Sequence, residues 1–226
     1  GTHTVRWSLD RVQSFINGDG YIRVDEVTWS PGDPAGLAAA LDFPGLTCVS
    51  TGNSATWFHQ TADSADGTDA ARAGLTPNNN KSPRYTIVSG PVVLYHDYSV
   101  SSGFGDRLRA YSDGVQILNS SASSWTKFVR RFDSGDHFVE WSYQKDGSAT
   151  GGMDTAWVDR LSTALPAALQ PSLEGTGLTF STGGGAAWTG YLAPGLAHDG
   201  TDFAGSGRVA LGGGESSWLE TTVNGP

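Results

Sequence analysis

The sequence GDHFVEWSYQKDGSATGGMDTAWVDRLS, residues 135–162, decides how the chain is organised, because residues 1–28, GTHTVRWSLDRVQSFINGDGYIRVDEVT, repeat its plan. At an offset of 134 the two stretches share identical residues in register, at His3 and His137, Val5 and Val139, Trp7 and Trp141, Ser8 and Ser142, Val24 and Val158, and Asp25 and Asp159. In both stretches the shared His, Val and Trp occupy alternate positions, and alternate residues lie on one side of an extended strand. Both stretches are therefore predicted to form half-buried antiparallel strands of the same module.

A second set of repeats relates the middle of the chain to its C-terminal part. GLTCVSTGNSATW at residues 45–57 returns as GLTFSTGGGAAW at 177–188, DGTD at 66–69 returns at 199–202, and YTIVSGP at 85–91 returns as ETTVNGP at 220–226. The offsets lie between 131 and 135, so the copies differ by single-residue insertions or deletions. Internal repeats define the organisation before any other signal. The predicted order is the end of one repeat at 1–30, a linker at 31–39, one complete repeat at 40–162, a second linker at 163–172, and the beginning of another repeat at 173–226.

The two partial copies together lack the equivalents of residues 92–134 of the complete repeat. A sheet that is cut in this way leaves open edges, which promote aggregation unless another strand pairs with them. We expect the partial copies to complete one another, either within one chain or between neighbouring chains in a fibre. The alternative is that the chain is a piece of a longer protein in which other residues complete them.

Composition favours a protein built from many short strands. Of the 226 residues, 38% are hydrophobic and 11% aromatic, enough for a core, while glycine is frequent at 31 residues and charged residues make up only 16%. This is the profile of strands joined by tight turns. Few lysines and many Gly, Ser, Thr and Asp residues are typical of a secreted or surface-displayed bacterial protein, so we expect an extracellular or cell-surface location.

Charge and hydropathy exclude two classes of partner. The net charge of −9 is spread without acidic or basic runs. No basic stripe with interleaved aromatic residues is present, which argues against nucleic acid. The sequence has no apolar run of 18 residues, so insertion into a membrane is not expected. The single cysteine, Cys48, excludes an intrachain disulfide, and because Phe180 is its counterpart we expect it to be a buried apolar group.

The strand pattern predicts an all-β fold. Alternation and turn residues predict strands at 2–9, 21–29, 46–49, 57–60, 85–88, 92–100, 107–111, 115–118, 125–132, 137–143 and 156–161. Asp113-Gly114 is the clearest two-residue hairpin turn. Two prolines and two glycines in residues 30–36 argue against regular structure there, and residues 37–43 hold at most one helical turn. Many short strands without a long helix predict an antiparallel β-sandwich, a jelly roll, with one complete and two partial repeats.

Several motifs carry a family resemblance that covers nearly the whole chain. They are the GLT segments with their following Trp, DGTD, SSWLETTVNGP, the hairpin at Asp113-Gly114-Val115, HxVxWSYxKDGS and WVDxL. Together they resemble a tandem module of large extracellular proteins of environmental bacteria, similar to MAM and concanavalin A-like jelly rolls. The resemblance implies two face-to-face antiparallel sheets and a role as spacer, adhesive unit or sugar binder. The N-terminal copy departs from the pattern, since Arg23 stands at the position of Trp157.

Catalytic motifs are absent from the sequence. A retaining glycosidase needs an acid and a nucleophile about 5 Å apart, and no ExDxxE run that would supply them occurs. There is likewise no GxSxG, HExxH or CxxC motif, and the five histidines show no metal-ligand spacing. We therefore predict that the chain is not an enzyme.

Acidic loops are the candidates for a metal. Asp63, Asp66 and Asp69 stand three residues apart, and Asp199 and Asp202 repeat the last two. Calcium takes six to eight oxygen ligands and suits such glycine-containing loops. We predict a structural calcium ion at these five residues. The alternative is that the aspartates cap turns, which Asp-Gly pairs commonly do.

Exposed aromatic rings are the candidates for a sugar. Sugar-binding sandwiches stack pyranose rings on exposed Trp or Tyr side chains. Trp157, Trp125 and Tyr95 are the predicted carbohydrate-binding residues. The other tryptophans at repeat-defining positions, Trp7, Trp57, Trp141 and Trp188, are predicted to lie in the core.

The sequence therefore favours one function and leaves a second open. The first is a non-catalytic extracellular repeat module that acts as a structural or adhesive spacer or as a fibre subunit. Its partners are neighbouring copies of the same repeat, and the partial repeats assemble through strand complementation. The alternative is a carbohydrate-binding module appended to a secreted enzyme, whose partner is a polysaccharide.

Overall fold

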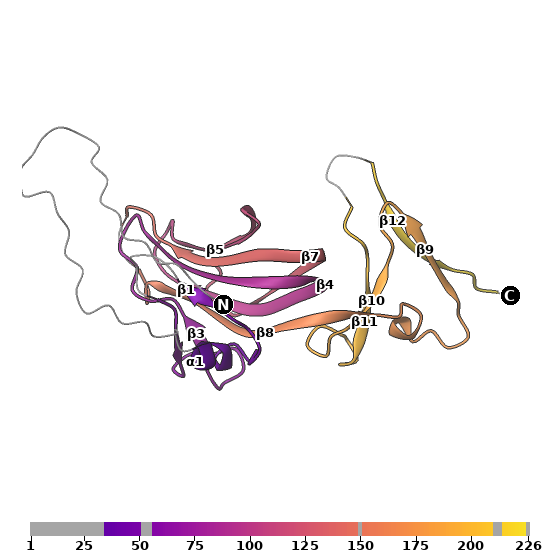
Figure 1. Cartoon of the computed structure of the whole chain (residues 1–226), viewed down its shortest axis with the longest axis horizontal. Helices are drawn as coiled ribbons and strands as arrows, with labels where there is room; N and C mark the ends of the chain where they lie inside the picture. The colour runs from indigo at the N-terminus through magenta and orange to yellow at the C-terminus, as the bar shows by residue number, and fades with distance from the viewer. Residues whose placement is uncertain (1–33, 51–55, 149–150, 210–213, 225–226) are drawn as a thin grey trace, which may run out of the picture. The chain divides into compact units, whose positions relative to one another are not determined.

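The computed structural model describes residues 34–50, 56–148, 151–209 and 214–224 (Figure 1). The chain divides into two compact units, Gly1–Gly32 and Asp33–Pro226, and every described residue belongs to the second. The strands predicted at 2–9 and 21–29, and the core position predicted for Trp7, lie outside the described residues. Pairing of residues 1–30 with 173–226 also stays a prediction.

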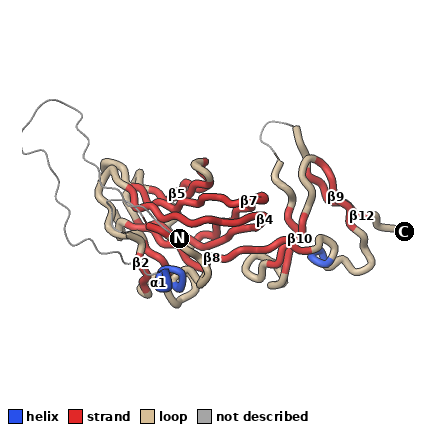
Figure 2. Tube along the Cα trace, in the orientation of Figure 1, coloured by secondary structure: helices blue, strands red, loops and turns tan. Residues whose placement is uncertain are grey.

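Among the described residues, strands make up nearly all of the regular secondary structure, and loops join them (Figure 2). The elements in chain order are α1 (Pro34–Ala39), β1 (Val49–Ser50), β2 (Phe58–Gln60), β3 (Ala70–Arg72), β4 (Lys81–Ser101), β5 (Arg107–Ser112), β6 (Val115–Ser120), β7 (Thr126–Gln144), β8 (Thr155–Ala167), the 3-10 turn η1 (Pro171–Leu173), β9 (Phe180–Gly184), β10 (Thr189–Leu192), β11 (Asp202–Gly205) and β12 (Ser217–Thr221). Every strand pair is antiparallel, which confirms the predicted all-β antiparallel class.

Both expected linkers contain regular structure. Helix α1 begins at Pro34, where a proline is tolerated because the first helical N–H has no intrahelical partner. It is held by packing, since Ala38 on the helix and Leu41 just after it are buried. Strand β8 continues to Ala167 because Leu165–Ala167 pair with β10, a partner that lies far along the sequence. The boundary predicted at residue 163 therefore falls inside a strand.

The long strands β4 and β7 form the centre of the sandwich. Residues 81–90 of β4 pair with 135–144 of β7, and after a register shift between Gly90 and Val92 residues 92–98 pair with 126–132. Strands β5 and β6 continue from the second half of β7, whereas β8 and β3 continue from the second half of β4. Side chains from both halves of β4 enter one hydrophobic cluster, including Val88 and Leu94.

The second half of β4 is buried on both faces. Val92, Leu94 and Val100 face the main hydrophobic cluster. On the other face, Val93 and Tyr95 belong to a second cluster whose members are Ala164, Tyr191 and Ala193, with Leu196 and Phe203 packed against it. Part of this strand is therefore covered by residues of the C-terminal copy.

The repeated sequences make the same strand pairs in the same register. Phe58 pairs with Arg72 between β2 and β3, and the equivalent residues Thr189 and Gly205 pair between β10 and β11. Between β1 and β4, Val49 pairs with Tyr85; between β9 and β12, the equivalent residues Ser181 and Glu220 pair.

A side-chain hydrogen bond is repeated as well. The Thr86 hydroxyl donates to the carbonyl of Thr47 at 2.8 Å, and in the C-terminal copy the Thr221 hydroxyl donates to the carbonyl of Thr179 at 2.8 Å. The two copies thus share local geometry and not only sequence.

A buried histidine links the two halves of the sandwich. His96 of β4 is fully buried, and its Nε2 accepts a 3.0 Å hydrogen bond from the indole N–H of Trp141 on β7. Its Nδ1 lies 3.3 Å from the carbonyl oxygen of Asp97, so the neutral ring with the proton on Nδ1 satisfies both partners. Burial lowers the pKa of His96 to about 4.

This histidine predicts a loss of stability in acid. The pKa of His96 lies below its unfolded value, so the unfolded state binds the extra proton, and stability present above pH 6.5 is lost as the pH falls toward 4. The full loss is about 3 kcal/mol. Urea unfolding at pH 7.5 and pH 4.5 measures it.

The matched control is the double variant His96→Phe/Trp141→Phe, which removes the imidazole together with the indole N–H that needs it. Other titrating groups, including His137, are present in both proteins, so the difference between them isolates His96. We expect the double variant to lose about 3 kcal/mol less than the wild type on acidification. An equal loss in both proteins would contradict the assignment.

Candidate functional site

The predicted sugar-binding aromatics do not form a common surface. Trp157 is 1% exposed and Tyr95 is 6% exposed, so neither ring face is open to a sugar, and the prediction that both lie on the surface is wrong. The Arg72 guanidinium lies over the Trp157 ring, and Tyr95 lies in the cluster with Tyr191. Trp125 is half-buried, and its indole N–H donates to Asp63 at 3.2 Å.

Of the residues predicted to lie in the core, some are buried and others are only half-buried. Trp57 and Trp141 are buried in the main cluster, which confirms their prediction. Trp188, the equivalent of Trp57, is only half-buried. Cys48 is half-buried rather than buried, and its sulfur accepts a 2.7 Å hydrogen bond from the buried guanidinium of Arg84, so it is not a purely apolar group.

The three aspartates of the first acidic loop point to separate partners. Asp63 accepts from Trp125, Asp66 accepts from the backbone N–H of Thr68 at 2.7 Å, and Asp69 is paired with His59 at 3.0 Å. Among the described residues, the single group of three or more acids, cysteines or histidines close enough to share an ion lies elsewhere. The prediction that Asp63, Asp66 and Asp69 converge on one ion is wrong, because each carboxylate has a different hydrogen-bonding partner.

The repeated acid Asp159 anchors this loop. Its carboxylate is fully buried and accepts the backbone N–H groups of Ala65 and Arg160, both at 2.6 Å. Burial raises the pKa of Asp159 to about 6, with a further contribution from the charges of Asp66 and Asp42. Arg160 has a positive φ of 48° and reaches Asp97 on β4 at 2.6 Å. The carboxylate therefore fixes backbone across 94 residues of sequence.

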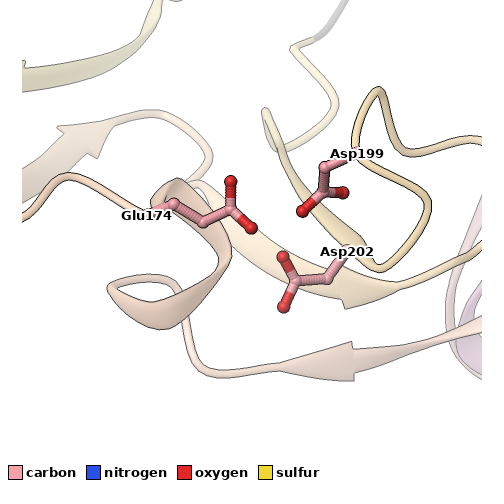
Figure 3. A group of neighbouring side chains, drawn as sticks. All are labelled: Glu174, Asp199 and Asp202. Atoms are coloured by element: carbon pink, nitrogen blue, oxygen red, sulfur yellow. The ribbon is translucent and has the colours of Figure 1, made fainter.

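The C-terminal copy gathers three carboxylates (Figure 3). Glu174, Asp199 and Asp202 each offer an oxygen within 4.8 Å of the others, and their side chains point toward one another. Hydrogen bonding between Glu174 and Asp199 raises the pKa of Glu174 and lowers that of Asp199. Two of the five predicted metal ligands thus come together with Glu174, which the sequence interpretation missed.

The fit to calcium depends on the oxygen count. Three carboxylates provide up to six oxygens, but one oxygen of Asp199 already accepts the N–H of Thr201 at 2.9 Å. Calcium needs six to eight oxygens, and water commonly supplies some of them. Glu174 has an acidic counterpart in the complete repeat, since Asp42 stands at its equivalent position and has the same positive φ, 58° against 50°.

An apolar groove that the sequence interpretation missed lies on the outer face of β1, β4 and β7. It has a volume of about 1010 Å³. Its aromatic wall is Tyr85 stacked on Phe138, with ring centroids 5.1 Å apart. Val49, Ile87 and Phe138 in the groove are each at least half exposed. The other lining residues are Phe43, Gly45, Leu46, Thr47, Thr86, Ser89 and Glu140.

The groove contains one carboxylate, which is already paired. The Lys81 ammonium lies 2.8 Å from Glu140, and this hydrogen bond raises the pKa of Lys81. A single paired carboxylate does not supply the acid and base of a hydrolase. The groove is therefore suited to binding an apolar or ring-shaped surface.

Comparison of the repeats is the signal that could have revealed this groove. At the positions of Val49, Tyr85 and Ile87, the C-terminal copy has Ser181, Glu220 and Thr222. At the positions of Phe138 and Glu140, the N-terminal copy has Thr4 and Arg6. Apolar residues that only the complete copy carries on an outer face are not required by the shared fold.

Comparisons with known proteins leave the family open. No family model matches the chain, and no curated protein matches it. Among solved structures, the secreted serine protease VesC from Vibrio cholerae aligns at 13% identity with a TM-score of 0.44, over 56% of this chain and 25% of that one. The K2 cleaved adhesin domain of Lys-gingipain aligns at 11% identity with a TM-score of 0.36, over 58% of this chain and 92% of that one.

A third solved structure is the enzymatically active domain of bacteriophage CBA120 tailspike protein 4, at 9% identity and a TM-score of 0.36, over 59% of this chain and 22% of that one. The chain therefore spans about a quarter of the length of the first of these proteins. Within the described part of the chain, no helix has the length and apolar character needed to cross a membrane.

The acidic group gives a testable expectation for calcium. A bound ion stabilises only the folded state, so millimolar calcium should raise the melting temperature above its value in EGTA. At a calcium concentration a hundred times Kd, the free energy of unfolding should increase by about 2.7 kcal/mol. Glu174→Gln and Asp199→Asn should abolish the increase. Differential scanning fluorimetry measures it.

Asp66→Asn is the matched control for Asp199→Asn, because both replacements keep an oxygen that accepts the backbone N–H two residues later. It should retain the full calcium response. The same response in all variants, or none in the wild type, would contradict a calcium site at Glu174, Asp199 and Asp202.

Proposed function

We propose that the chain is a non-catalytic repeat module of a bacterial extracellular or cell-surface protein, acting as a structural or adhesive spacer in which successive repeats are joined without a flexible linker. The continuity of β8 carries this proposal. Its residues 155–164 pair with β4 of the complete repeat, and Leu165–Ala167 pair with β10 of the following copy. Backbone hydrogen bonds therefore run from one repeat into the next.

Side-chain packing at the same junction supports this role. Tyr191 is 1% exposed and lies with Tyr95 and Ala164 in the second cluster. A Cβ at Gly195 would come within 2.9 Å of the Tyr95 ring, so the chain after β10 approaches this ring closely. A spacer requires a fixed angle between modules, and a strand pair with a buried cluster provides one.

The repeated acids support a non-catalytic role. Asp159 holds two backbone N–H groups, while Asp66 and Asp199 make the same turn contact in their two copies. The recurrence of these aspartates is explained by their hydrogen bonds to the backbone, so a catalytic role is not needed to account for it.

The junction is tested by Tyr191→Ala. Truncating this buried ring should cost about 3 to 5 kcal/mol at the junction and free the segment from Ala168 onward. Limited proteolysis should then cleave near Gln170 at least tenfold faster than in the wild type, and small-angle X-ray scattering should show a broader distance distribution. The matched control, Tyr111→Ala, removes a half-buried tyrosine from β5, away from the junction.

Equal cleavage of the wild type and Tyr191→Ala would count against a rigid junction. Turnover of a glycan or peptide by the purified chain would count against the non-catalytic part of the proposal.

A second candidate function is carbohydrate binding, now at the groove. It is favoured by the half-exposed Phe138 ring and its stacking partner Tyr85, with the hydroxyls of Thr47 and Ser89 in the same lining. Sugar rings bind through aromatic stacking with a few polar contacts.

Phe138→Ala tests this function. Affinity electrophoresis in gels that contain soluble polysaccharides should show retardation of the wild type and at least a tenfold weaker effect for the variant. Val129→Ala, an exposed apolar residue in the other half of β7, is the control and should behave as the wild type. If no polysaccharide retards the wild type, this second function is wrong.

A further inference from the structure

A buried lysine lies between two aspartates at one end of the sandwich. Lys145 follows β7, Asp154 precedes β8, and Asp106 precedes β5. The side chains of Lys145 and Asp106 are each 1% exposed, and that of Asp154 is 13% exposed. Three segments of the chain thus enclose one amine and two carboxyl groups, almost cut off from water.

The lysine nitrogen contacts the carboxyl group of Asp154 through both oxygens. Nζ of Lys145 donates to Oδ1 and to Oδ2, so it lies beside the carboxyl carbon Cγ that carries them. An amine forms an amide by attacking this carbon, and holding the two reacting groups in contact removes much of the entropic barrier. The pair is therefore positioned for condensation as well as for an ion pair.

Two further side chains are placed to assist proton transfer. Oδ2 of Asp106 lies 3.8 Å from Nζ of Lys145, and its Oδ1 accepts the backbone N–H of Asp146 at 3.0 Å, which fixes the carboxyl group. The Tyr143 hydroxyl donates to Oδ1 of Asp154 at 3.0 Å. Burial and this hydrogen bond raise the pKa of Tyr143, so the hydroxyl keeps its proton. An acid–base group thus lies beside the amine, and a hydrogen-bond donor lies on the carboxyl oxygen.

The ionised form of this group is poorly balanced. It holds two carboxylates and one ammonium, and burying such charges costs free energy that their attraction offsets only in part. In the ion pairs of Lys81, Lys127 and Arg160, by contrast, the basic side chain is 49%, 36% and 45% exposed. Condensation of Lys145 with Asp154 removes one charge of each sign from the buried site.

We propose that Lys145 and Asp154 are joined by an isopeptide bond, an amide between two side chains that forms within the folded chain. Asp106 takes a proton from the ammonium and passes it to the Asp154 carboxylate, and the freed amine attacks Cγ. The C–N bond forms, one C–O bond breaks, and a second proton passes from the nitrogen through Asp106 to the departing oxygen, which leaves as water. No other reactant is consumed, and Asp106 ends as a carboxylate. The inference does not depend on the proposed role as a repeat module.

The bond links the two halves of the sandwich. Lys145 follows the part of β7 that pairs with residues 81–90 of β4, and Asp154 precedes β8, which pairs with residues 93–101 of β4. Because the site is almost closed to water, hydrolysis of the amide is disfavoured. Unfolding of either half therefore leaves the two strand ends joined.

Mass spectrometry of the intact, denatured and reduced chain tests the bond. The wild type should be lighter by one water than the mass calculated from its sequence. Trypsin should fail to cleave at Lys145, because the modified side chain is no longer basic, and should release residues 132–160 as one peptide that lacks one water. A wild type with the full calculated mass would overturn the proposal.

Cyanogen bromide locates the bond. Met153 is the single methionine of the sequence and lies inside the bridged segment. Cleavage after it should leave residues 1–153 and 154–226 joined on a denaturing gel, whereas a chain without the bond separates into two fragments. A succinimide at an Asp-Gly pair also lacks one water but does not join the fragments, so a light chain that separates would overturn the proposal as well.

Three variants assign the residues. Lys145→Arg keeps a basic side chain but lacks the amine, so it should have the full mass and separate into fragments. Lys81→Arg is the matched control, because it makes the same replacement in the exposed pair with Glu140, and it should behave as the wild type. Asp106→Asn keeps an oxygen for the N–H of Asp146 but cannot carry the proton. Sampled at equal times of expression, it should contain at least about tenfold less of the joined species.

Formation of the joined species in Lys145→Arg would overturn the bond. Formation at the wild-type level in Asp106→Asn, in a chain whose far-UV circular dichroism matches the wild type, would overturn the role of Asp106.

Discussion

A strand that is buried on both faces holds this structure together. Residues 92–100 of β4 have no face left for solvent, so each face needs an apolar cover. One cover is the main cluster of the complete repeat. The other includes Tyr191 and Ala193 of the C-terminal copy. Because Val93 and Tyr95 would otherwise be exposed, the complete repeat and the copy that follows it are energetically coupled.

The local features of the fold were predictable because they depend on short sequence. Alternation along residues 107–112 gives the observed alternation of half-buried and buried side chains in β5. The Asp113-Gly114 turn has positive φ at both residues, 52° and 80°, as a two-residue hairpin requires. The two DGTD segments form the same turn, in which an aspartate accepts the N–H two residues later. These outcomes need no knowledge of distant partners.

Predictions that depended on distant partners were wrong. Alternation places Trp157 of β8 and Tyr95 of β4 on the faces of their strands that point away from the main core. Only the fold shows that Arg72 covers Trp157 and that Tyr191 covers Tyr95. The metal prediction assumed that the regular spacing of Asp63, Asp66 and Asp69 would bring their carboxylates to one ion. Their actual partners include Trp125, 62 residues away, which no local pattern identifies. Glu174 was missed for the same reason, since it follows η1 and meets Asp199 only through the fold.

Differences between the copies distinguish the residue positions that the fold constrains from those that it leaves free to vary. The buried Arg84 makes a polar contact with the half-buried Cys48, and at their equivalents the C-terminal copy has Phe180 and Leu219, both apolar. The two positions changed together, as expected if they meet in both copies and an unpaired buried guanidinium is costly. The groove residues behave differently, because Val49, Tyr85 and Ile87 become polar while the strand pairs around them keep their register. Packing therefore constrains the inner positions in the complete repeat and in the described C-terminal copy, whereas the outer positions of the complete repeat are free to serve a surface of its own.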